Sequence, residues 1–262
     1  MSRVGRIGAL VAEGVREHVY LAGLFWSLVR VALKPRTWGR TVRAELVRQI
    51  YVCGVQASRF VLYVAVAVGL SVVAQALLWL QRIGQPDLLG PLLVAVLVRE
   101  AAPVLTNLLA ISRNGTTMTV GLGQMRLSGE VRVLDAQGVD PLVYLVLPRV
   151  LGLIIAVFCL NMLFLAAAMG SGFLFSALLS DSLGDPARFT QSVLTSVSSV
   201  DLANFLVKTL VPALLTGIVC CHEGLKVQGS ASRVLSASRR ALAQAVRALF
   251  LVSALMSLWT YL

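Results

Sequence analysis

The sequence predicts an all-α, polytopic membrane protein with an N-terminal interfacial amphipathic helix, five transmembrane helices and a short cytoplasmic helix between spans two and three. Of its 262 residues, 58% are hydrophobic and only 13% are charged, whereas soluble domains usually carry roughly 25% charged residues. The mean hydropathy is +0.84, and five stretches are long and apolar enough to cross a hydrocarbon core of about 30 Å. These values exclude an ordinary soluble enzyme, a disordered chain and a fibrous repeat.

The N-terminal part, residues 1–45, is predicted to lie along the membrane surface. Residues 46–262 are predicted to form the transmembrane bundle of a single domain that covers residues 1–262. Apolar side chains recur at helical spacing through residues 7–33, and most of the charged side chains fall outside this stripe. Such a pattern is typical of a helix in the membrane interface, with packing on a partner's soluble domain as the alternative.

The five predicted spans differ in how many charges they contain. Residues 60–80 contain no charge over 21 residues, and residues 150–180 contain none over 31 residues. The second of these stretches exceeds one perpendicular crossing, which implies a tilted span or a helix that extends beyond the lipid. The predicted spans are residues 60–80, 88–112, 150–180, 202–221 and 241–262.

Basic residues are concentrated in alternate connecting segments. Residues 1–59 contain ten Lys/Arg and three acids, and the segments after spans two and four are also basic. The segments after spans one and three contain only Arg82 and Arg188 as basic residues. Because positively charged segments stay in the cytoplasm, we expect a cytoplasmic N-terminus and a C-terminus on the outer side. The net charge of +11 then reflects this orientation against an anionic leaflet and not nucleic-acid binding.

A short polar segment, residues 128–138, lies between spans two and three and is predicted to be helical. Ser128 is the expected N-cap, and Glu130 in the first turn suits the positive end of the helix dipole. Val131 and Leu134 are three positions apart and therefore share a face of the helix.

The end of this segment is marked by two further signals. Gly138 fits the left-handed position that ends a helix, and Asp140-Pro141 opens the next helix with an N-cap and a proline at the first position. Together the signals predict a helix of about nine residues, parallel to the membrane and joined to two spans. Such a helix suits docking into a groove of a soluble partner, and an ordered loop without a partner is the alternative.

Two ionisable residues, Arg99 and Glu100, lie inside the second predicted span. Charges there are costly and usually face a bundle interior or a water-filled cavity. Adjacent positions point about 100° apart on a helix, so we expect each side chain to have its own partner. A structural ion pair with a neighbouring helix and a role in a cavity or in gating both remain open.

Motifs for catalysis, metal binding and nucleotide binding are absent from the sequence. There is no G-x-x-x-x-G-K-[ST] to hold a nucleotide phosphate and no H-E-x-x-H to hold zinc. His18 and His222 are the only histidines, and the four cysteines show no C-x-x-C spacing. We therefore expect no catalytic residue, no metal site and no cofactor bound by this chain.

Residues 99–149 match a pattern that begins R-E-x-x-P-V-x-x-x-L-L and ends V-D-P-x-x-x-x-x-x-P-R. On these residues the chain resembles the MlaE/YrbE permeases of Mce-associated ABC lipid transporters. Residues 46–51, LVRQIY, are also similar to the segment LVRQLY that precedes the first span in that family. The matching positions are Arg99, Glu100, Pro103, Val104, Leu108, Leu109, Arg113, Gly115, Gly123, Met125, Arg126, Leu134, Val139, Asp140, Pro141, Pro148 and Arg149.

The chain departs from this family pattern at several charged positions. Gly121 and Gly129 stand where the pattern has Glu, Glu130 stands where it has Gln, and Arg132 stands where it has Asp. The length of the short helix and its end signals are retained. We interpret the change as that of a diverged relative with its own cognate ATPase.

The resemblance implies the permease subunit of an ABC transporter in the bacterial inner (cytoplasmic) membrane, moving phospholipid or a related lipid. The implied partners are a second copy of the chain, a cytoplasmic ABC ATPase dimer, a hexamer of Mce-domain proteins, the lipid and, as a further candidate, a small regulatory protein on the ATPase. ATP and Mg would be bound by the ATPase. The implied coupling residues are Ser128, Gly129, Glu130, Val131, Arg132, Leu134, Asp135, Gly138, Asp140 and Pro141.

The resemblance also implies an apolar cavity for the lipid and a gate. Arg99 suits a phosphate headgroup, or a carboxylate elsewhere in the chain, and the small residues of span one equally suit helix packing. An intramembrane lipid-modifying enzyme and a non-transporting scaffold subunit are the alternative functions. The candidate cavity or gating residues are Arg99, Glu100, Asn107, Ala65, Gly69, Leu70 and Leu77.

Overall fold

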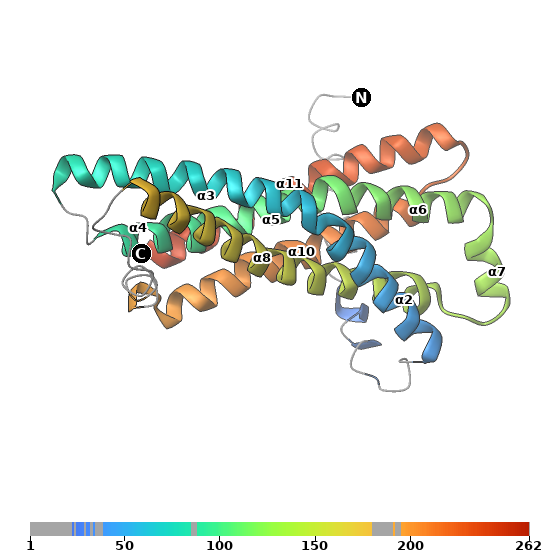
Figure 1. Cartoon of the computed structure of the whole chain (residues 1–262). Helices are drawn as coiled ribbons and strands as arrows, with labels where there is room; N and C mark the ends of the chain where they lie inside the picture. The colour runs from blue at the N-terminus through green and yellow to red at the C-terminus, as the bar shows by residue number, and fades with distance from the viewer. Residues whose placement is uncertain are drawn as a thin grey trace, which may run out of the picture.

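The computed structural model describes residues 23, 25–28, 30, 31, 34, 39–84, 88–179, 191 and 195–261. Over this part of the chain the regular structure is entirely helical, with no strand. Five helices are long and apolar enough to cross a membrane, and Figure 1 shows them as one elongated bundle. The predicted all-α fold with five membrane-crossing helices is confirmed.

Three of the five long helices are built from α-helical and π-helical pieces that follow one another without a break. The first comprises α2 (Arg40–Ile50), η2 (Tyr51–Val55) and α3 (Gln56–Ile83). The second comprises α4 (Leu89–Leu93), η4 (Val94–Ala101), α5 (Ala102–Ala110), η5 (Ile111–Gly115) and α6 (Thr116–Leu127). The third comprises η6 (Leu142–Val146) and α8 (Leu147–Leu179), and the last two are α10 (Ser199–Leu225) and α11 (Ala231–Tyr261).

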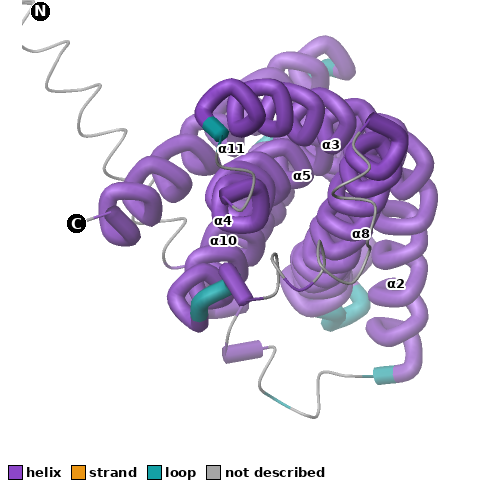
Figure 2. Tube along the Cα trace, turned by 60° about the vertical axis from the view of Figure 1, so that its left-hand side comes forward, coloured by secondary structure: helices purple, strands orange, loops and turns teal. Residues whose placement is uncertain are grey.

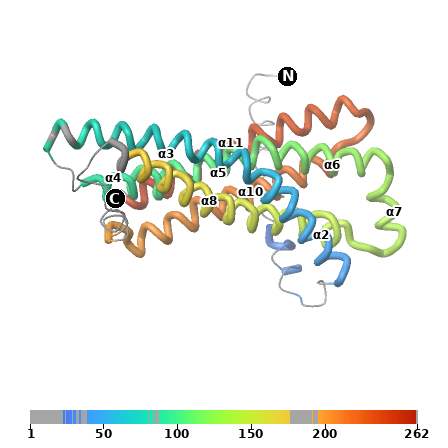
Figure 3. The backbone as a smooth tube through the Cα atoms, in the orientation of Figure 1, coloured from blue at the N-terminus to red at the C-terminus, as the bar shows by residue number. Residues whose placement is uncertain are grey.

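These helices are longer than the predicted spans, because a charge ends an apolar run but does not end a helix. The second helix continues past Arg113 to Leu127, whereas its predicted span ends at residue 112. As a result, α6 and the beginning of α11 extend side by side at one end of the bundle, and α7 (Glu130–Ala136) lies at the tip of this extension (Figures 1 and 3).

The second span occupies the middle of the bundle. Its α5 contacts α3, α8, α10 and α11, and Figure 2 shows α4 and α5 with these helices around them. Leu93, Leu97 and Ala102 are completely buried there. Around this centre, α3 packs along α8, and α10 packs along α11.

Close contact between α3 and α8 depends on small residues. A Cβ atom on Gly69 would lie 2.2 Å from the carbonyl oxygen of Ala168, and one on Gly172 would lie 2.3 Å from Cγ2 of Val73. Ala65 and Leu77 are also buried. Ala65, Gly69 and Leu77 therefore face the packed interior of this chain, which agrees with the helix-packing alternative and not with an open cavity beside them.

The end of the predicted short helix is confirmed. Gly138 has a φ of +75°, and the backbone N–H of Leu142 donates to Oδ1 of Asp140 at 2.9 Å, so Asp140 caps the next helix. The helix itself, Glu130–Ala136, has 7 residues and is slightly shorter than the predicted segment 128–138.

The prediction that Ser128 caps this helix is wrong. Gly129 occupies the N-cap position with a φ of +83°. Ser128 Oγ instead donates to Glu130 Oε1 at 2.8 Å and lies 3.2 Å from the carbonyl oxygen of Met125. Because the left-handed Gly129 reverses the chain, Ser128 remains at the end of α6. The glycine that stands in place of the family's Glu thus makes the turn between α6 and α7.

Most of the predicted N-terminal interfacial helix lies outside the described residues. Residues 25–28 and 30–31 are helical, and Leu28 belongs to the same buried cluster as Val131. Trp26 is exposed, with the Arg30 guanidinium 5.2 Å from its ring centre. This part of the helix therefore packs on the chain's own bundle and presents an aromatic side chain outward, as interfacial helices do.

Gly69→Ala is expected to destabilise the bundle, because the added methyl group would collide with the α8 backbone at Ala168. Overpacking of this kind costs about 1–3 kcal/mol, so the midpoint of thermal unfolding in detergent should fall. Gly170→Ala is the matched control, since a Cβ atom there meets nothing within 4 Å and alanine favours a helix over glycine. Equal midpoints for the two variants would contradict tight packing at Gly69.

Candidate functional site

Two ion pairs join the second and fourth spans inside the bundle. Nε of Arg99 lies 2.6 Å from Oδ1 of Asp201, and Nζ of Lys208 lies 2.7 Å from Oε1 of Glu100. Arg99 and Glu100 thus have separate partners, as expected from their adjacent positions in the sequence. Both partners come from α10, so Arg99 and Glu100 form ion pairs with a neighbouring helix, which was one of the two predicted alternatives.

The spacing of these four residues explains how two spans can form two pairs. Asp201 and Lys208 are seven positions apart, close to two turns of helix, so they share one face of α10. Arg99 and Glu100 lie in the π-helical segment η4. Asp201 also accepts a hydrogen bond from the backbone N–H of Ser198 at 3.0 Å, as part of a capping box. The same carboxylate therefore caps the start of α10 and binds Arg99.

Lys208 and Asp201 carry the most enclosed charges of the cluster, since each side chain is 1% exposed. The Glu100 side chain that pairs with Lys208 is 38% exposed. All three ammonium protons have acceptors: Oε1 of Glu100 at 2.7 Å, Oγ of Ser257 at 2.8 Å and the carbonyl of Arg99 at 3.2 Å. Ser257 lies on α11, so the second, fourth and fifth spans all meet at this ammonium group.

A second layer of buried polar side chains connects the third span to the same place. Nδ2 of Asn161 on α8 donates to Oγ1 of Thr209 at 2.6 Å, and Oγ1 of Thr106 lies 3.4 Å from Oδ1 of Asn161. Nδ2 of Asn107, one of the predicted residues, donates to the carbonyls of Pro103 at 2.9 Å and Thr209 at 3.3 Å. All these side chains are buried. We call the ion pairs, Ser257 and this layer the polar cluster.

The sequence reasoning missed most of this second layer. Asn161, Thr209 and Thr106 are uncharged residues within long apolar runs, and only their polarity in a hydrophobic setting could have marked them. Asn204 is a further case, since its side chain is 2% exposed and has no hydrogen-bond partner among the described residues. Of the span-one candidates for a cavity, only Leu70 is exposed.

The short helix α7 packs on the bundle through one of its sides. Val131 is 3% exposed, in a buried cluster with Leu122 and Val146, and Leu134 packs against that cluster. The shared face of Val131 and Leu134 is thus turned toward the chain's own spans, and it does not lie free for a partner. Val133, at 56% exposure, is the apolar side chain that α7 presents outward.

No candidate metal centre is present among the residues that the structure describes. Among the described residues, no group of three or more His, Cys, Asp or Glu side chains lies close enough to hold a metal ion. The candidate site instead consists of two parts: the ion pairs between the second and fourth spans, and the exposed helix α7 between the second and third spans.

Five helices long enough and apolar enough to cross a membrane, packed around a buried polar cluster, are the architecture of a polytopic membrane protein. Residues 46–259 match the family model described as Permease MlaE. The chain belongs to the MlaE family of ABC transporter permeases.

Named relatives agree with this membership. A probable ABC transporter permease protein of Synechocystis is 29% identical over 81% of this chain and 80% of its own length. The intermembrane phospholipid transport system permease protein MlaE of Haemophilus influenzae is 28% identical over 76% of each chain. The chloroplastic protein TRIGALACTOSYLDIACYLGLYCEROL 1 of Arabidopsis thaliana is 26% identical over 72% of this chain and 54% of its own length.

Glu100→Gln is expected to destabilise the bundle more than Lys208→Met. The first change leaves a buried ammonium group without its counter-charge, whereas the second leaves a carboxylate that is partly exposed. Stranding a buried charge costs about 2–4 kcal/mol once the exposure of its partner is considered. The measurement is the thermal unfolding midpoint of each purified variant.

The double variant Glu100→Gln/Lys208→Met should recover most of the loss, because it removes both charges. Arg48→Met is the control, since the Arg48–Glu45 pair lies within one helix and its arginine is exposed; its cost should be below about 1 kcal/mol. Additive losses in the double variant would show that the two charges are not coupled.

Proposed function

We propose that the chain moves phospholipid or a related lipid between the bacterial inner membrane and an Mce-domain partner, as one of two permease copies driven by a separate cytoplasmic ABC ATPase. Membership of the MlaE family supports the permease role, and the name of the Haemophilus influenzae relative, an intermembrane phospholipid transport system permease, supports phospholipid as the substrate class. ATP and Mg belong to the ATPase in this proposal.

The observation that carries the proposal is the position of α7. It lies between the helices Leu89–Leu127 and Leu142–Phe175, and its exposed side carries Val133, Arg132 and Asp135. Its other side is fixed to both helices through Val131. A partner that moves α7 would therefore move two spans with it, which is what a subunit without its own nucleotide site requires.

The polar cluster is the proposed gate. Glu100 and Arg99 are 38% and 27% exposed on the surface of a single chain, although they lie within a span. Exposed charges at this depth need water or a second protein surface. A cavity between two permease copies would supply both, and separation of the second and fourth spans would break both ion pairs together.

The orientation in this proposal follows the basic residues. The end of the bundle with α7 lies in the cytoplasm together with the N-terminal region, and the C-terminus lies on the periplasmic side. The lipid would leave the membrane on that outer side, toward a hexamer of Mce-domain proteins. A small regulatory protein would act on the ATPase.

The test is reconstitution in steps. The purified chain alone should hydrolyse no ATP, and proteoliposomes with its ATPase should hydrolyse ATP and pass a fluorescent phospholipid to a soluble Mce-domain acceptor. Chemical change of the lipid by the chain alone would favour an intramembrane enzyme. Unchanged lipid flux after Arg99 and Glu100 are both replaced would favour a scaffold subunit.

Two valines on α7 provide a matched pair of variants. Val133→Asp should leave the thermal unfolding midpoint unchanged and weaken ATPase binding, because Val133 is exposed. Val131→Asp should lower the midpoint by burying a charge, at a cost of about 3 kcal/mol or more. Full lipid-dependent ATPase activity in Val133→Asp would contradict docking through α7.

A further inference from the structure

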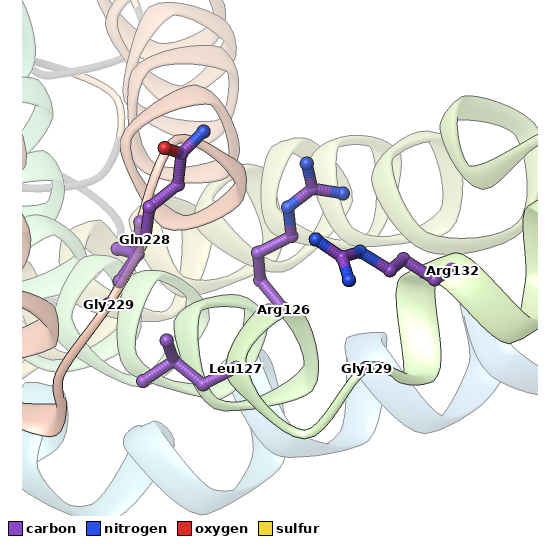
Figure 4. A pocket seen from close by; sticks show the side chains of 7 residues that line it. Arg126, Leu127, Gly129, Arg132, Gln228 and Gly229 are labelled. Carbon is purple, nitrogen blue, oxygen red and sulfur yellow. The ribbon is translucent and has the colours of Figure 1, made fainter.

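A basic pocket lies beside α7, between two turns of the chain. It has a volume of about 340 Å³ and opens where the α6–α7 turn approaches the α10–α11 turn (Figure 4). No acidic side chain lines it. The lining residues are Arg126, Leu127, Gly129, Arg132, Val227, Gln228 and Gly229.

Two guanidinium groups converge on this pocket without a counter-charge. Figure 4 shows Arg126 and Arg132 extending toward one another. Neither guanidinium group forms an ion pair or a hydrogen bond with any described residue. The neighbouring acid, Glu130, accepts a hydrogen bond from Ser128 Oγ instead. The two guanidinium groups carry like charges and repel each other. An oxyanion between them would be attracted to both and would accept hydrogen bonds from several of their N–H groups.

The height of the pocket above the membrane favours a protein over a lipid as the source of the oxyanion. Arg59 and Arg113 are both exposed, and they lie at the same depth relative to the membrane because Arg113 donates to the carbonyl of Gln56, three positions before Arg59. Arg59 directly precedes the apolar run of the first span, so both arginines mark the membrane surface. Arg126 is 13 positions beyond Arg113, about 20 Å along the helix. A headgroup layer is only about 5–8 Å thick, so the pocket lies beyond it.

The surroundings of the pocket also suit a protein. Val133 on α7 and Leu235 on α11 are both exposed. A more apolar hollow of about 500 Å³, lined by Leu127, Val120 and Leu235 among others, adjoins the basic pocket at Leu127. Exposed apolar side chains next to arginine are typical of the centre of a protein–protein interface.

The charges of this segment point to the chemistry of the partner. The pocket lining contains two arginines and no acid, so a group that fills it must bring negative charge. We infer that the pocket receives an acidic side chain of the cognate ATPase, whose carboxylate lies between Arg126 and Arg132. This inference rests on the proposed docking of the ATPase to α7, and it makes the pocket a determinant of which ATPase binds.

The experiment compares charge reversals in nanodiscs of phosphatidylcholine and in nanodiscs that also contain phosphatidylglycerol. The probe is the ABC ATPase that co-purifies with the wild-type chain, identified by peptide sequencing and produced separately. Arg126→Glu and Arg132→Glu should each weaken its Kd by about tenfold or more, with a smaller dependence on salt than wild type. Arg132→Lys should retain most of the affinity.

Arg239→Glu is the matched control, because Arg239 is exposed on α11 outside the pocket; its Kd should change by less than about twofold. An equal loss in all three reversals would overturn the inference in favour of diffuse attraction. A loss seen only with phosphatidylglycerol would overturn it in favour of a lipid headgroup. If both pocket variants bind the ATPase unchanged while Val133→Asp loses binding, the inference about the pocket is overturned and the proposed function stays intact. If the wild-type chain binds no ATPase, both the inference and the proposed function are overturned.

Discussion

An ammonium group enclosed between helices in a membrane needs a carboxylate beside it, and this need organises the centre of the bundle. Lys208 is that group, and Glu100 is its carboxylate. Because Arg99 and Asp201 form a second pair between the same two helices, the register of α10 against η4 is fixed at two points. A shift of α10 by one residue would break both pairs and leave charges stranded in a medium where that is expensive.

The π-helical segments impose a related requirement. Buried backbone groups must be satisfied within the protein, and a π-helical turn disturbs the regular hydrogen-bond ladder. Side chains of η5 meet this need for the first span: Nδ2 of Asn114 donates to the carbonyl of Cys53 at 3.1 Å, and Arg113 donates to the carbonyl of Gln56. Gly115, also in η5, leaves room for α10, since a Cβ atom there would lie 3.1 Å from Sγ of Cys220. Irregular backbone in one span is therefore compensated by its neighbours.

These two requirements explain how much of the structure could be predicted from the sequence. The number of spans follows from apolar runs, and separate partners for Arg99 and Glu100 follow from helix geometry. The identity of those partners does not, because nothing local in residues 99–100 specifies which face of which helix will lie opposite. Asn161 and Thr209 escaped notice because they are uncharged and lie within long apolar runs. Ser128 was misjudged because a glycine that adopts a left-handed turn outweighs a good capping residue one position earlier.

In the proposed function, the two sides of α7 would let a small helix act on a large bundle. Val131 is packed in one cluster with Leu122 of α6 and Val146 of η6, so α7 cannot move without carrying the ends of two membrane-crossing helices. Val133 and Arg132 lie on the exposed side, where a contact would cost no core packing. Because interiors are close-packed and transmit displacement with little compression, a force on α7 would pass along the second span, which contains η4 and therefore Arg99 and Glu100. Both ion pairs that join this span to α10 lie at that position, so displacement of the span against α10 would strain the two pairs together.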